Sequence, residues 1–188
     1  MMHVWRAAAL LFLAPPFWQV RPPEKWSDLE IQELLTESPW AHQLGPTPLV
    51  VYLATAAPIE EAEAEERRRG HSTAYQPDFD YADYLRLHRE EILVLAIPYP
   101  PKTGFGTAEQ QRRMEEESQI RVGRRAYQLL GHFPPTQNDP VLRLVFPRRV
   151  DASDKSILFR LFLPGISFPE REAEFKVKDL MYRGRFEM

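Results

Sequence analysis

The chain has 188 residues, enough for one ordinary domain, and its 44% hydrophobic and 27% charged residues are typical of a globular protein. It contains no cysteine, which excludes disulfides, thiolate metal sites and cysteine nucleophiles. The net charge of −3 is uneven, because the last 70 residues carry 13 Lys and Arg against 8 Asp and Glu. That surplus is a weak field for its length, so we expect a solvated strand face and no nucleic-acid partner.

The first 18 residues are typical of an export signal or tether. Arg6 precedes an apolar run at residues 7–14, and Pro15 and Pro16 follow it. This order matches a signal peptide, and the run is shorter than the roughly 20 residues that span a bilayer. Pro15 disfavours cleavage after Ala14, which leaves three readings: a poorly cleaved signal, an uncleaved tether that would be the chain's membrane contact, or a cytosolic tail. Residues 19–24 predict an extended spacer before a domain at 25–188.

Residues 25–41 predict a short helix with a tryptophan near each end. Ser27 and Glu30 have the spacing of a capping box, and Pro39 ends the helix. So short a helix is marginal alone and must dock on something. The apolar residues either belong to the core of the domain, which we favour, or bind a protein partner; they are Trp26, Ile31, Leu34, Leu35 and Trp40. The acidic polar face argues against a membrane-surface helix.

In the rest of the chain, strands and helices alternate at first, and the later elements are mainly strands. Strands are expected at residues 48–55 and 91–98, and helices at 58–69, 76–91 and 107–117, the first of them on the surface. Residues 120–122 and 127–130 fit either a helix or a strand. Further strands are expected at residues 141–146, 157–163, 174–178 and 181–188. This order predicts a single α+β domain with a largely antiparallel sheet and short polar helices in its N-terminal half.

Three segments together resemble a set of uncharacterised exported bacterial proteins. They are WSDLEIQELLTESPWA, the RLVFPR of residues 143–148 and the FKVKDLMYRGRF of residues 175–186, which occur in the same order in those proteins. The resemblance implies export and a single domain. It implies no activity and no catalytic residue.

Few residues have the spacing of a chemical site. The loop before the helix at 107–117 could hold a small anion at a helix N-terminus, through Lys102, Thr103, Gly104, Gly106 and Thr107, although an ordinary loop and cap is the better reading. Asp78, Asp80 and Asp83 lack the glycine and distant glutamate of a calcium loop, so we expect no metal or cofactor. Glutamates at residues 60–66 and 115–117 are interpreted as solvated helix faces.

These patterns favour an exported, non-catalytic interaction or scaffold module of the cell envelope, whose oligomeric state the sequence does not indicate. The alternative is a hydrolase or transferase with a site assembled from residues far apart in sequence. A buried carboxylate or histidine with a shifted pKa in a cleft would favour the enzyme. A large exposed apolar patch would favour the binding module.

Overall fold

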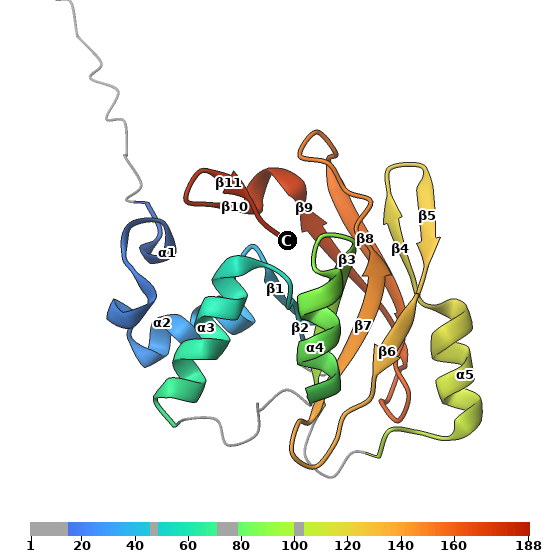
Figure 1. Ribbon diagram of the computed structural model, residues 1–188. Helices are drawn as coiled ribbons and strands as arrows, with labels where there is room; N and C mark the ends of the chain where they lie inside the picture. The colour runs from blue at the N-terminus through green and yellow to red at the C-terminus, as the bar shows by residue number, and fades with distance from the viewer. Residues whose placement is uncertain (1–14, 46–48, 71–78, 100–103) are drawn as a thin grey trace, which may run out of the picture.

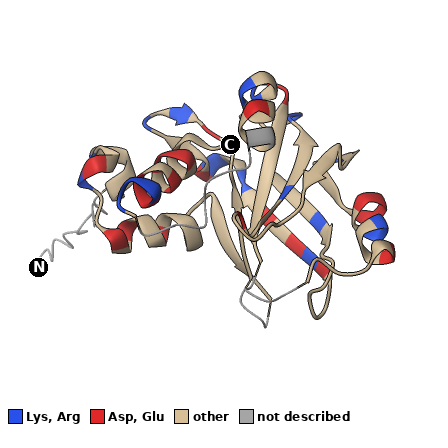
Figure 2. Cartoon of the chain, turned by 60° about the horizontal axis from the view of Figure 1, so that its bottom comes forward, with Lys and Arg blue, Asp and Glu red and all other residues tan. Residues whose placement is uncertain are grey.

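The computed structural model describes residues 15–45, 49–70, 79–99 and 104–188 (Figure 1). The predicted α+β class is confirmed, with helices gathered toward the N-terminal half and antiparallel strands elsewhere. The helices are α1 (Phe17–Val20), α2 (Asp28–Thr36), α3 (Ala57–Arg68), α4 (Phe79–His88) and α5 (Ala108–Glu117), with short 3-10 turns η1 (Pro23–Lys25) and η2 (Val177–Asp179). Acidic and basic residues are interleaved along the helices (Figure 2).

The strands form two sheets and a terminal hairpin, and neighbouring strands of the described residues pair antiparallel. The first sheet has the order β1-β2-β3-β7-β6, from β1 (Ala41–Leu44), β2 (Leu49–Leu53), β3 (Ile92–Pro98), β7 (Val141–Pro147) and β6 (Gly131–Phe133). The second has the order β5-β4-β8-β9, from β5 (Arg125–Gln128), β4 (Gln119–Val122), β8 (Ser156–Phe162) and β9 (Glu170–Lys176). The hairpin joins β10 (Met181–Tyr182) to β11 (Arg185–Phe186).

The segment that fitted either a helix or a strand is the hairpin β4–β5. Val122 pairs with Arg125, so a two-residue turn joins the strands, and Gly123 in that turn has φ +60°. Glycine adopts this conformation without steric cost, which favours a tight hairpin over a continued helix. Two short edge strands, β1 and β6, were not predicted, because segments of four and three residues carry too little alternation to detect.

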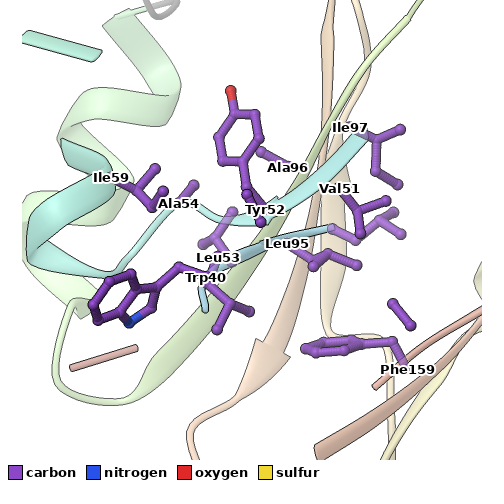
Figure 3. Close-up of a cluster of buried hydrophobic side chains, with 14 of the residues drawn as sticks. Trp40, Val51, Tyr52, Leu53, Ala54, Ile59, Leu95, Ala96, Ile97 and Phe159 are labelled. Carbon is purple, nitrogen blue, oxygen red and sulfur yellow. The ribbon is translucent and has the colours of Figure 1, made fainter. Parts of the chain in front are cut away.

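The two faces of the first sheet have different partners. Along β7, Leu142, Leu144 and Phe146 point to one side, and Phe146 meets Phe159 of the second sheet with ring centroids 5.4 Å apart. Arg143 therefore points to the opposite side, toward helices α3 and α4. Figure 3 shows Phe159 below the strands that carry Val51 and Leu95, on the side of the second sheet.

The N-terminal segment is folded against the domain, so the expected extended conformation of residues 19–24 is wrong. Helix α1 and turn η1 occupy this stretch, with Pro23 at the first helical position, where its fixed φ and missing N–H suit a helix start. The Gln19 amide donates to the Met181 carbonyl at 2.5 Å and accepts from the Arg183 N–H at 2.7 Å. Gln19 of helix α1 thus fastens this segment to the terminal hairpin.

Candidate functional site

The five apolar residues of the opening helix lie in the core, so the partner-binding interpretation of them is corrected. Trp26, Ile31, Leu34, Leu35 and Trp40 are all buried, and none is more than 8% exposed. The Trp40 indole donates to the Glu187 carbonyl at 2.8 Å, and Figure 3 places its ring beside Leu53 and Ile59. A partner cannot reach these side chains in this conformation. The predicted capping box of Ser27 and Glu30 is present.

The predicted anion loop is, in its described part, a helix cap. Lys102 and Thr103 lie outside the described residues. The Thr107 hydroxyl accepts from the Gln110 N–H, and the Gln110 side chain accepts from the Thr107 N–H, so a capping box occupies these donors. Gly106 has φ +69°, and a Cβ there would lie 2.8 Å from the Gly165 N. Gly106 therefore serves close packing and Thr107 serves helix initiation, whereas a Cβ at Gly104 would meet nothing within 4 Å.

The feature of greatest chemical interest is a cleft of about 420 Å³ between helix α3, helix α4 and the first sheet. It is lined by Ala54, Glu60, Glu63, Arg67, Tyr81, Ala82, Leu85, Arg86, Arg89 and Arg143. Its volume lies in the range of about 300–1,000 Å³ that is usual for small-molecule sites. We call it the α3–α4 cleft.

The floor of the α3–α4 cleft comes from the register of the sheet. Tyr52 pairs with Ala96, and Ala96 pairs with Arg143, so these side chains emerge on the same face of three neighbouring strands. The small Ala96 stands between the two long polar residues. The Tyr52 hydroxyl lies 2.9 Å from a Glu63 carboxylate oxygen, which ties the sheet to helix α3.

A buried ion pair supports this floor. The Arg143 guanidinium donates to Asp139 at 2.5 Å, and both side chains are only 4% exposed. The guanidinium carbon also lies 4.4 Å from the centre of the Tyr81 ring of helix α4. Burying two charges costs several kcal/mol per ion unless pairing and hydrogen bonds compensate, so a purely structural role would be served more simply by apolar residues.

Glu63 is the unusual carboxyl of the cleft, and its position corrects the interpretation of residues 60–66 as a solvated face. Its side chain is 16% exposed. Burial raises the pKa of the Glu63 carboxyl above its ordinary value, although Arg143, Tyr52 and Arg67 each act in the opposite direction. Glu65 of the same helix is buried, and hydrogen bonds from Arg68 and Arg69 lower the pKa of its carboxyl. Helix α3 therefore faces the protein with carboxyl groups in two different electrostatic environments.

We predict that Glu63→Gln makes the protein more stable than wild type by an amount that grows with pH. A carboxyl with a raised pKa binds its proton more tightly in the folded state, so stability falls as pH rises from the ordinary value of 4.5 through the raised one. The loss is about 1.4 kcal/mol per pH unit in that window, and glutamine avoids it. Urea unfolding at a series of pH values measures the difference. Exposed Glu90→Gln is the control, and parallel profiles for wild type and Glu63→Gln would contradict the prediction.

Two of the three arginines at the rim of the cleft have weaker ion pairs than Arg143 on its floor. Arg67 lies 3.8 Å from Glu63, and Arg86 lies 3.3 Å from Asp83 in a pair whose side chains are 71% and 69% exposed. Arg89 has a stronger ion pair, because its guanidinium donates to both carboxylate oxygens of Glu60, at 2.5 and 2.6 Å. Two rim arginines thus have only loose ion pairs, and a third is fixed.

Sequence reasoning missed this site because its residues come from three separate segments, at 54–67, 81–89 and 143. One signal was available: Arg143 interrupts an otherwise apolar strand, VLRLVFP, where a charge needs a buried partner. Nothing in the sequence shows that helices α3 and α4 meet over that face. Among the described residues no group of His, Asp and Glu is arranged to hold a metal ion, and no helix is long and apolar enough to cross a membrane.

Comparisons with protein-family models, with curated proteins and with solved structures find no significant match to this chain. The ligand-binding part of the function is therefore inferred from the geometry of the α3–α4 cleft.

Proposed function

We propose that the protein is a non-catalytic exported binding module of the cell envelope, and that it binds a small molecule in the α3–α4 cleft. The observation that carries this proposal is an open cleft of about 420 Å³ whose lining combines apolar side chains with the buried Arg143 and the partly buried Glu63. Buried groups of this kind are costly for stability and gather at functional sites. The large exposed apolar side chains are, in contrast, few among the described residues, which favours a small ligand over a broad protein interface.

The first experiment compares wild type with a variant whose cleft is filled. Ala82 lines the cleft from helix α4 and is exposed, so Ala82→Trp adds bulk there without disturbing the core. Leu87→Trp is the matched control, because Leu87 is on the same helix, is 68% exposed and does not line the cleft. Each full-length protein is incubated with the small-molecule fraction of a cell extract, and bound compounds are identified by mass spectrometry after denaturation.

We expect a compound that is retained by wild type and by Leu87→Trp and is lost from Ala82→Trp. Equal recovery from all three proteins, or no recovery from any, would contradict the proposal. Circular dichroism of each variant checks that the fold is unchanged.

A hydrolase or transferase is the second candidate, and Glu63 is the observation that favours it. A carboxyl with a raised pKa beside a cleft has the property required of a general acid, which must hold its proton near the working pH. The same experiment separates the two functions. A binding module releases the compound it took up, whereas an enzyme converts it over time, and Glu63→Gln would abolish the conversion while leaving binding in place.

Export rests on the leader pattern and on the resemblance described above, and the folded N-terminal segment adds a constraint. Phe17 meets Trp26 with ring centroids 5.7 Å apart, and Trp18 meets Trp40 at 6.2 Å. Removal of the first 18 residues would strip these rings from the core, whereas cleavage after Ala14 would leave them. We therefore propose a processed protein that begins no later than Phe17, which N-terminal sequencing of the natively expressed protein tests.

A further inference from the structure

We infer that the ligand of the α3–α4 cleft carries an anionic oxygen group, a carboxylate or a phosphate, on a small apolar body. This inference rests on the proposed function and adds the chemical class of the ligand. The lining itself holds four arginines and two glutamates, and the acidic partners of Arg86 and Arg143, Asp83 and Asp139, lie outside it. The apolar part of the lining is Ala54, Ala82, Leu85 and the Tyr81 ring, which suits a body of modest size.

The two loosely paired arginines, Arg67 and Arg86, are the ones that would hold the anion. An exposed ion pair contributes only about 0–1 kcal/mol, so exchanging Asp83 for a ligand oxygen costs Arg86 little. The Arg67 guanidinium is 3.8 Å from Glu63, beyond hydrogen-bond distance. Guanidinium groups match carboxylate and phosphate geometry through two parallel N–H donors, which makes arginine the usual residue for such ligands.

Glu63 is the carboxyl nearest to Arg67, and its Oε1 already accepts from the Tyr52 hydroxyl at 2.9 Å. Burial raises the pKa of the Glu63 carboxyl, which disfavours a negative charge beside Arg67. The floor arginine, Arg143, stays committed to Asp139, and Arg89 stays committed to Glu60.

The arginines of helix α5 show what an ordinary solvated face looks like in the same molecule. Arg112 bonds to Glu109 at 2.7 Å and to Glu116 at 2.8 Å, and Arg113 bonds to Glu117 at 2.7 Å. These side chains have close partners three or four residues away on one helix. Arg67 and Arg86 pair at the same spacings, with Glu63 and Asp83, but at the longer distances of 3.8 and 3.3 Å, and both arginines line the same cleft.

The test measures binding of three probes to the full chain by isothermal titration calorimetry. Benzoate supplies a carboxylate, phenyl phosphate supplies a phosphate, and benzamide is a neutral molecule of nearly the same shape as benzoate. We expect at least one of the two anions to bind at micromolar to millimolar concentration, and benzamide to bind at least tenfold more weakly. Whichever anion binds more tightly identifies the preferred group.

Three variants connect that binding to the proposed residues. Arg67→Gln and Arg86→Gln should each weaken anion binding about tenfold, the usual effect of losing one charge-assisted hydrogen bond. Arg112→Gln is the control, since it removes a helical arginine outside the cleft whose exposure of 56% lies between those of Arg67 and Arg86, and this variant should bind as wild type does. Anion binding that is unchanged in Arg67→Gln and Arg86→Gln, or that Arg112→Gln weakens equally, would overturn the inference.

The outcome also separates this inference from the proposed function. If benzamide binds as well as benzoate and Ala82→Trp abolishes both, the cleft is a ligand site for neutral molecules, and only the anion assignment fails. If none of the probes binds at millimolar concentration and the extract yields no compound dependent on the cleft, both proposals fail. Anion binding that persists in Ala82→Trp places the site elsewhere and overturns this inference.

Discussion

Trp40→Ala is expected to lower the free energy of unfolding by about 3–5 kcal/mol, the range for deleting a large buried aromatic side chain. Trp40 is fully buried, and its ring stands edge-to-face with Trp18 and with Tyr182, each at a centroid distance of 6.2 Å. Alanine would leave a cavity among these rings, and the Glu187 carbonyl would lose its indole donor at 2.8 Å. The loss is large because one side chain links helix α1, the first sheet and the terminal hairpin.

Denaturant unfolding followed by circular dichroism measures this effect. Leu29→Ala is the control from the neighbouring helix, because Leu29 is 79% exposed and its truncation should change stability by no more than about 0.5 kcal/mol. A near-neutral result for Trp40→Ala would contradict the core assignment. It would revive the interpretation of the opening helix as a partner-binding element.

Asp139→Ala is expected to destabilise the protein by a similar amount, about 3–5 kcal/mol, because it leaves the Arg143 guanidinium buried without its carboxylate. Both side chains are 4% exposed, so water cannot replace the missing partner without opening the structure. Arg143 also stacks over the Tyr81 ring, so its displacement would move helix α4. We therefore expect the α3–α4 cleft to lose its shape along with the stability.

The double variant Asp139→Ala with Arg143→Met separates the penalty of an unpaired charge from the value of the pair. Replacing a whole buried ion pair by apolar residues is often neutral or stabilising, so the double variant should recover most of the stability that Asp139→Ala loses. Chemical denaturation of the two variants measures the recovery. A double variant as unstable as the single one would show that the pair itself, and not merely its completeness, holds the sheet to helix α4.

Together these two variants test the two layers that position the cleft. Trp40 belongs to the apolar packing that holds the first sheet in place, and Arg143 belongs to the polar face of that sheet. Of these two residues, only Arg143, on the polar face of the first sheet, lines the α3–α4 cleft. A stability loss from Trp40→Ala with anion binding retained below the unfolding transition would therefore be consistent with both assignments.

Local chemistry by itself determined most of the elements. The Ser27 and Glu30 capping box, the proline at the start of helix α3 and the continuous apolar run of β3 each act within a few residues, and the structure confirms all three. Strands as short as β1 and β6 were not predicted, because strand propensity can be recognised only over more residues than these strands contain. The extended conformation predicted around Pro22 and Pro23 was wrong for a different local reason. Proline fixes φ at a value that is compatible with both an extended chain and the start of a helix.

Only the tertiary structure decided the site. Whether Glu63 is solvated or buried depends on helix α4 and on the face of β7 that carries Arg143, and these lie about 20 and 80 residues farther along the chain. The sequence by itself determined that this chain forms short polar helices and antiparallel strands around an aromatic core, since propensity, capping and alternation are local properties. Charge environments are set by neighbours in space, so the α3–α4 cleft exists only once the sheet register brings Tyr52, Ala96 and Arg143 onto one face.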